Sequence, residues 1–430
     1  MRPLNLAKLN HILIPQTKTA RDRFRDGRFG RVVAPLTGFY EALSDEGRLV
    51  ASMAFVFGGF ALDVRHTEIY VVWCALVALV VASIALRRGY RLDDVRVEVE
   101  VPRRVTVAEE MRFAFVVRND GARDHRALRV RGPFLPWDGK WIGDMPRVRR
   151  LAPGATARVE VGCRFAERGE HHLDSFSAAA LVPLGLSLGR PLRSTGCRLL
   201  VVPKIARVER LALPTGRRHQ PGGVALASKT GESMDLLGVR PYRAGDAVRD
   251  LHAKSWARLG VPVVREYQEE YFSRIGVVVD TAVEAAEAGG AKDPERLLEA
   301  AVSLAAGVVA HLSRGEALID LLVAGGRVHE LTLGRSLGFL DQALDLLACV
   351  KPGPRLDPDA MVERLATHLT RLSCVIVIAL GHDDGELAER IRGYGVACTV
   401  IAVGDRNAAR DRESKTVAAE SIERGEALAL

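Results

Sequence analysis

The sequence has few cysteines, and none of them forms the C-x-x-C pattern of zinc ribbons and dithiol redox sites. The six cysteines lie far apart in the 430-residue chain, at positions 74, 163, 197, 349, 374 and 398. This spacing excludes a disulfide-rich scaffold and a zinc finger, and it favours a reducing compartment.

Outside the first 40 residues, the sequence has almost no excess of positive over negative charge. The chain has 61 Lys and Arg residues against 53 Asp and Glu residues, and its net charge is +8. Eight basic and two acidic residues lie within residues 1–40, so the remainder is close to neutral. A near-neutral remainder argues against nucleic-acid binding. A basic segment directly before apolar runs indicates an anchor for anionic lipid, in preference to a solvated tail.

Long hydrophobic runs are confined to one region. Leu49–Leu62 has 14 uncharged residues and Ile69–Leu86 has 18. At about 1.5 Å per helical residue, the second run reaches roughly 27 Å, close to the hydrocarbon thickness of a bilayer. Basic residues flank the pair on both outer sides. This predicts a transmembrane helical hairpin in the inner membrane, with both termini in the cytoplasm. The alternative is a buried helical hairpin in a soluble protein.

Residues 92–205 change to the alternating pattern of β-strands. Asp94–Val101 alternates strictly between charged residues and valine, as a half-buried strand does. Further strands are predicted at 113–117, 127–131, 158–164 and 198–202, with turn residues between them. This pattern predicts an antiparallel β-sandwich. Trp137 and Trp141 either form a contact surface or close the end of the sandwich core.

Residues after 272 alternate between buried strands and helices. Ile275–Val279 is an apolar run that ends in Asp280, as a buried parallel strand would. The alternation predicts a doubly wound α/β sheet. Its further strands are expected at 317–323, 374–380 and 396–403, and its helices at 294–314, 337–349, 361–372 and 385–394. The predicted domains are therefore a basic N-terminal segment (1–46), two transmembrane helices (47–88), a β-sandwich (92–205), a linker with a signature segment (206–271), an α/β domain (272–404) and a charged tail (405–430).

The signature segment interleaves opposite charges with aromatic residues. Six basic and six acidic residues lie between Asp235 and Glu270, whereas a phosphate-tracking groove would have an excess of basic ones. Arginines can pair with carboxylates in bidentate geometry and stack on aromatic rings. Such a network either staples a loop to its domain or presents a surface to a protein partner. We expect Asp246 and Arg249 to pair with each other, and Lys254 and Arg258 to face a partner.

The signature resembles the bacterial family called domain of unknown function fifty-eight. The matching pattern is Arg240-x-Tyr242-x-x-Gly245-Asp246-x-x-Arg249-x-Leu251, then Lys254-Ser255-x-Ala257-Arg258, then Val264-Arg265-Glu266-x-x-Glu269. The resemblance covers residues 48–404. It departs at Ala253, where the family usually has Trp, and at residues 182–186, where Asp-Pro-Phe-Gly-Leu is common. The predicted interaction residues are Arg240, Tyr242, Gly245, Asp246, Arg249, Lys254, Trp256, Arg258, Arg265, Glu266 and Glu269.

The resemblance also implies a von Willebrand factor A-like α/β domain and a MoxR-type AAA+ ATPase as partner. That fold often binds Mg²⁺ through D-x-S-x-S, because carboxylate and hydroxyl oxygens suit this ion. Here the stretch is Asp280-Thr281-Ala282-Val283-Glu284, so both serines are lost. Asp280 is expected to cap the strand-to-helix crossover, and Mg²⁺ binding by Asp280 with Asp383 is disfavoured.

The leading prediction is a membrane-anchored cytoplasmic scaffold without catalytic activity, which works with the ATPase in the assembly or maturation of protein complexes. The main alternative is a metal-dependent hydrolase that uses Asp280 and Asp383. A serine hydrolase built on Asp250, His252 and Ser255 is disfavoured, since no G-x-S-x-G elbow is present. An envelope protein with external domains is opposed by the two spans and the cysteine pattern.

Overall fold

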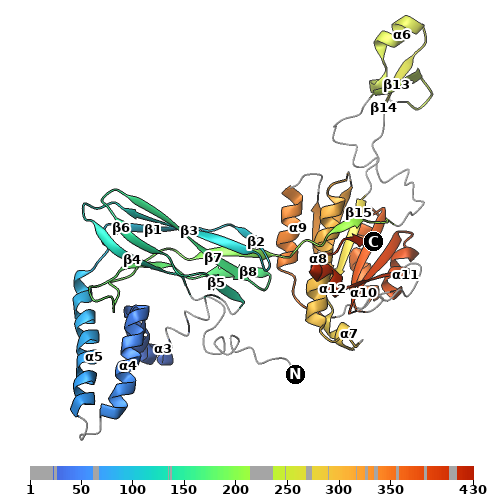
Figure 1. The fold of residues 1–430 in the computed structure, drawn as a ribbon. Helices are drawn as coiled ribbons and strands as arrows, with labels where there is room; N and C mark the ends of the chain where they lie inside the picture. The colour runs from blue at the N-terminus through green and yellow to red at the C-terminus, as the bar shows by residue number, and fades with distance from the viewer. Residues whose placement is uncertain are drawn as a thin grey trace. The chain divides into compact units, whose positions relative to one another are not determined.

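The computed structural model divides the chain into two compact units, residues 1–202 and 203–430 (Figure 1). The structure describes residues 23, 27–61, 67–133, 135, 138–213, 236–246, 248–267, 274–288, 290–315, 317–324, 328–333, 338–354, 358–381, 385–405 and 414–430.

Three helices open the first unit. They are α3 (Arg28–Ala42), α4 (Asp45–Ala61) and α5 (Thr67–Leu86). Helices α4 and α5 pack side by side (Figure 1). Among the described residues, one helix is long and apolar enough to cross a membrane. It covers Glu68–Gly89, which includes all of α5 except Thr67, and has a mean hydropathy of 2.7. Helix α4 has 17 residues, fewer than the about 20 that a perpendicular span needs.

Residues 92–202, here called the strand-rich body, form three small sheets. The first sheet has the strand order β1 (Val95–Glu100), β3 (Glu110–Asn119), β7 (Thr156–Phe165) and β5 (Gly139–Ile142). The second has the order β10 (Leu192–Arg193), β9 (Ser177–Ala180), β4 (His125–Arg131) and β6 (Arg147–Leu151). The third has the order β2 (Arg104–Thr106), β11 (Cys197–Val202) and β8 (Gly169–Leu173). The first two sheets are antiparallel throughout, and in the third only β2 and β11 pair in parallel.

An aromatic cluster fills the core between these sheets. Phe113 and Phe115 on β3 contact Phe176, with ring centroids 5.4 and 4.6 Å apart. Trp141 on β5 lies 5.7 Å from Phe113 and 6.0 Å from Phe176. Trp141 therefore packs on the core and does not form a separate contact surface. Trp137 lies outside the described residues.

The second unit is built on a six-stranded sheet. Its order is β17 (Val328–Leu333), β16 (Leu318–Ala324), β15 (Arg274–Asp280), β18 (Cys374–Leu380), β19 (Ala397–Gly404) and β20 (Ser414–Ala418). Strand β17 runs antiparallel to β16, and the other pairs are parallel. The helices are α7 (Val283–Ala288), α8 (Pro294–Leu312), α9 (Gly338–Ala348), α10 (Pro358–Leu369), α11 (Gly385–Gly393) and α12 (Ala419–Arg424).

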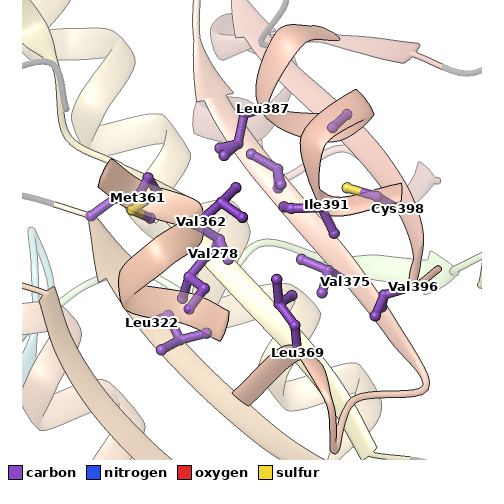
Figure 2. Packing of buried hydrophobic residues seen from close by; sticks show 14 of the residues in the cluster. Val278, Leu322, Met361, Val362, Leu369, Val375, Leu387, Ile391, Val396 and Cys398 are labelled. Carbon is purple, nitrogen blue, oxygen red and sulfur yellow. The ribbon is translucent and has the colours of Figure 1, made fainter. Parts of the chain in front are cut away.

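Apolar side chains alternate between the two faces of this sheet. On one face, Val278, Val375 and Cys398 pack with Met361, Val362 and Leu369 of α10 and with Leu387 and Ile391 of α11 (Figure 2). Helix α8 contacts β15, β18 and β19, and most of its side chains are buried, including Leu297, Leu298 and Val302. A parallel sheet covered by helices explains why its strands read as continuous apolar runs.

Two predicted boundaries in this unit are wrong. Residues 405–430 were expected to be a charged tail, but β20 is the edge strand of the sheet and β21 (Leu428–Ala429) pairs in parallel with β12 (Val208–Arg210). Strand β12 lies within the segment expected to be a linker. Just before β12, Ala206 N donates a hydrogen bond of 3.1 Å to Ser303 O on α8. The residues around β12 and the C-terminal residues 414–430 therefore belong to the α/β domain.

Candidate functional site

The signature segment forms a small hairpin of its own, here called the signature hairpin (residues 236–267). Strand β13 (Leu236–Pro241) pairs antiparallel with β14 (Val263–Tyr267). Between them lie a tight turn, the 3-10 helix η3 (Val248–Asp250) and helix α6 (Ala253–Leu259). Helix α6 ends at Gly260, which has a φ of 70°, a left-handed conformation that glycine adopts without a steric cost. The irregular loop expected from the sequence is thus an ordered hairpin with a helical cap.

Arg240 and Asp246 form the central ion pair of the signature hairpin. Arg240 Nη1 donates to Asp246 Oδ2 at 2.8 Å, and Nη2 donates to Oδ1 at 2.9 Å. The backbone N–H of Arg243 donates to the same Oδ2 at 2.7 Å. The bond from Arg240, followed by that from Arg243, lowers the pKa of Asp246 to about 2. Because charge-assisted bidentate pairs are geometrically specific, this carboxylate fixes the turn against β13.

The expected pairing of Asp246 with Arg249 is wrong. The side chain of Arg249 is 86% exposed, and it pairs with Asp250, with Nε 3.8 Å from Oδ1. The turn after β13 carries Asp246 back to the strand, so its arginine partner is six residues earlier and not three later. Gly245, with a φ of 107°, sits at this reversal.

Other residues of the signature hairpin expose both apolar and basic side chains on its surface. Exposed large apolar side chains are Val239, Tyr242, Val248, Trp256, Leu259 and Val261. The exposed basic residues are Arg243, Arg249, Lys254, Arg258 and Arg265. The side chain of Glu266 and the whole of Glu269 lie outside the described residues. The described part of the signature therefore combines apolar and basic side chains around a fixed ion pair.

His252 and Ser255 contact each other at the start of α6. His252 Nδ1 lies 2.6 Å from Ser255 Oγ, and His252 is the residue before the first turn of the helix. This places the pair at the N-terminus of a seven-residue helix. The contact joins the cap residue to the first turn of α6.

Of the two carboxylates predicted at the sheet edge, Asp280 is among the described residues. Asp280 ends β15, where its Oδ1 accepts a hydrogen bond of 2.9 Å from Ala282 N. Asp280 thereby holds the turn into α7, as expected for a residue that caps the crossover. Asp383 lies outside the described residues. Among the described residues no group of three His, Cys, Asp or Glu side chains is arranged to hold a metal ion.

Two buried polar pairs were not anticipated from the sequence. Asp320 is fully buried on β16 and pairs with Arg274 on β15. Its charge inside an otherwise apolar run is the signal that could have revealed it. In the strand-rich body, Asp138 and His171 are both buried, and their side chains are hydrogen-bonded at 2.8 Å. These two residues are 33 positions apart, and no local motif joins them.

Comparison with known proteins finds a family match over part of the chain but no described activity. No curated protein matches the chain. A fragment of Escherichia coli alpha-2-macroglobulin is 17% identical, with a TM-score of 0.21, over 26% of this chain and 17% of that chain. The FixG-related protein from Vibrio parahaemolyticus is 13% identical, with a TM-score of 0.19, over 25% of this chain and 97% of that one. A CARDB domain from Pyrococcus furiosus is 17% identical, with a TM-score of 0.19, over 25% of this chain and 88% of that domain.

Structural likenesses this weak carry no argument, and this chain spans less than a fifth of the macroglobulin fragment. The family match is of a different kind, because it begins in the signature hairpin and runs through the α/β sheet. Residues 238–417 match the family described as "Protein of unknown function DUF58". Over these residues the match supports the family that the signature resembles.

Proposed function

We propose that this protein is a membrane-anchored scaffold whose signature hairpin binds a protein partner on the cytoplasmic side. The observation that carries this proposal is the surface of the hairpin, where Trp256, Leu259 and Arg258 are exposed on α6. Aromatic and arginine side chains are the residues most enriched at energetically important positions of protein interfaces. The bidentate pair of Arg240 and Asp246 holds the turn of the same hairpin against β13.

A partner with an acidic surface fits this hairpin best. Residues 236–267 contain six basic and three acidic residues, and one basic residue is already neutralised by Asp246. Complementary charge speeds association and fixes the orientation of partners. A MoxR-type AAA+ ATPase, the partner that the family resemblance implies, is the candidate we propose, with a role in the assembly or maturation of protein complexes.

The anchor we propose is a pair of spans, α4 and α5. Helix α5 is long enough alone, and α4 packs along it. The short α4 would be accommodated by local thinning of the bilayer or by snorkelling of Arg48 at its cytoplasmic end. The order of the six-stranded sheet, with β15 at its centre and an antiparallel β17 at one edge, supports the proposal that the α/β domain is von Willebrand factor A-like.

Co-purification of the full-length protein with its ATPase tests the partner surface. Trp256→Ala and Arg258→Ala should keep a near-normal melting temperature but capture less ATPase. The matched controls are Tyr394→Ala and Arg371→Ala, which remove an exposed aromatic residue and an exposed arginine from the α/β domain. Capture equal to that of the unchanged protein by both hairpin variants would refute the proposed surface.

A further inference from the structure

One loop of the strand-rich body holds the ends of the membrane helices. This helix-contact loop comprises residues 182–189. Ser44, just before α4, donates from Oγ to Gly185 O at 2.5 Å and from its backbone N to Leu186 O at 3.1 Å. Near the end of α5, Ser83 Oγ donates to Ser187 Oγ at 2.7 Å, and Ser187 Oγ donates to Ser83 O at 2.8 Å. Both helices are therefore fixed to the same loop.

The contact between α4 and the helix-contact loop leaves no room for a side chain at position 47. A Cβ atom added to Gly47 would lie 1.8 Å from Leu186 O, far inside van der Waals contact. Two arginines extend the contact, since Arg131 donates to Glu41 O and Leu43 O and Arg87 donates to Gly189 O at 3.5 Å. The helix-contact loop thus fixes the level at which α4 and α5 meet the strand-rich body.

Helix α3 reaches this level with an exposed apolar stripe, in which the Arg48 guanidinium lies 3.9 Å from the centroid of the Tyr40 ring. Val32, Leu36, Phe39 and Tyr40 follow the i, i+4, i+7, i+8 spacing of one helix face, and their exposed fractions are 76, 68, 44 and 57%. The helix ends at Ala42, whose carbonyl accepts a hydrogen bond of 2.8 Å from Leu188 N in the helix-contact loop. The extended conformation of Leu43 separates α3 from α4, so α3 is not a continuation of the span.

The helix-contact loop adds an apolar side chain of its own. Leu184 is 60% exposed and has a φ of 77°, a left-handed conformation that is uncommon for a residue with a bulky side chain. It lies one residue before Gly185, whose carbonyl binds Ser44. A large apolar residue is therefore held in a strained turn beside the junction of α3 and α4.

We propose that α3 lies in the lipid–water interface, with the stripe and Leu184 inserted at the boundary between headgroups and acyl chains. This inference rests on the proposed membrane anchor. Lipid is the favoured occupant because the stripe ends at Tyr40, five residues before α4 begins, and the apolar side chains Phe55 and Phe60 of α4 are 85 and 63% exposed. Arg28 and Arg31 on α3 are exposed, and so are Arg88 and Arg91 after α5. Basic and apolar side chains together are the signature of interfacial helices on anionic lipid.

Helix α3 would then be a second attachment to the bilayer, and it would fix the orientation of the strand-rich body. Spanning helices alone would allow the strand-rich body to tilt with them. An interfacial helix joined to the same helix-contact loop holds one side of the body against the bilayer surface.

A fluorescent probe on α3 tests this placement in the full-length protein. Leu36→Cys and Leu184→Cys report the proposed lipid contacts. Ala34→Cys is the matched control, because Ala34 is exposed on nearly the opposite side of α3. Cys74→Ala and Cys349→Ala remove the membrane-helix thiol and the exposed thiol from the background. Each variant is labelled with bimane in vesicles of phosphatidylcholine and phosphatidylglycerol.

Two quenchers decide the outcome. At positions 36 and 184, nitroxide-labelled lipid should quench the probe and aqueous iodide should not, whereas position 34 should show the reverse. Iodide quenching at position 36 equal to that at 34 would place the stripe in water and overturn the proposal. Protection of position 36 from both quenchers would overturn it in favour of a second copy or another protein on the stripe. Retention of the protein in carbonate-washed vesicles reports the spanning anchor separately, so failure of the anchor is distinguishable from failure of this inference.

Discussion

Arg274 holds both carboxylate oxygens of Asp320 across two neighbouring parallel strands. Nε donates to Oδ2 at 2.7 Å and Nη2 donates to Oδ1 at 3.0 Å. Asp320 is fully buried, while the Arg274 side chain keeps 22% of its surface exposed. The pair lies at the first residue of β15, so it secures the point where the chain enters the central strand.

Breaking this pair should destabilise the α/β domain strongly. Arg274→Ala leaves an uncompensated carboxylate in the interior, and we expect a loss of about 3–5 kcal/mol of unfolding free energy. The double variant Arg274→Met with Asp320→Leu should recover most of that loss, since no buried charge remains. Urea unfolding of the three proteins measures the difference. Equal stability of Arg274→Ala and the unchanged protein would show that the pair contributes little.

The ion pair of the signature hairpin should control local opening. Arg240→Ala removes the main partner of Asp246, so the hydrogen bond from Arg243 N to this carboxylate should weaken. We expect faster hydrogen exchange across residues 238–267 and an unchanged melting temperature of the α/β domain. Arg249→Ala, which removes an exposed arginine of the same hairpin, is the control and should leave exchange unchanged. Similar exchange in the two variants would contradict the assignment.

The buried pair in the strand-rich body predicts a pH dependence. His171 Nδ1 lies 3.0 Å from Gly169 O, and Nε2 lies 2.8 Å from Asp138 Oδ2. Carbonyl and carboxylate oxygens are acceptors, so these two contacts favour the protonated ring, which can donate from both nitrogens. Burial alone would lower the pKa of His171, but the hydrogen bond and charge of Asp138, with smaller contributions from Gly169 O and Glu167, raise it.

The sign of the effect follows from this raised pKa. The stabilisation is complete below the unfolded pKa of about 6.5 and is lost as the pH rises through the folded value. Hydrogen exchange of β8 peptides, corrected for the intrinsic pH dependence, should therefore accelerate above that value. Asp138→Asn removes the carboxylate charge and should move the acceleration to lower pH. A profile that is flat from acidic to alkaline pH would contradict the doubly donating ring.

Membrane topology provides a further test. Basic residues flank α4 and α5 on both outer sides, so a reporter fused after Leu430 should be active only in the cytoplasm. Alkaline phosphatase activity at that position would instead place the α/β domain outside. That result would support a single membrane span and contradict the two-span hairpin.

Periodicity located the elements of the α/β sheet well where packing and local pattern agree. The predicted strand 374–380 coincides with β18, because a strand buried on both faces is apolar throughout. Strand β17 was missed although Val328–Leu333 alternates in part. Strand β20 has little apolar pattern, and its pairing with β19 is a tertiary effect that a local window does not contain.

The candidate site was predictable in composition but not in pairing. Spacing placed Arg249 closer to Asp246 than Arg240 is, yet the backbone reversal at Gly245 selects Arg240. Contacts between distant segments, such as Ser83 with Ser187 and Asp138 with His171, depend on how strands and helices meet. No short-range motif encodes them.

The parallel pairing of β15 also determines the order in which the sheet can assemble. Its two neighbours come later in the chain, and Ile275 pairs with Cys374, about 100 residues away. Contacts with such long sequence separation form slowly, because a long loop must close first. Until β18 is made and docked, one apolar edge of β15 stays open. This interval is when the chain is most prone to aggregate and when a chaperone would have the greatest effect on its yield.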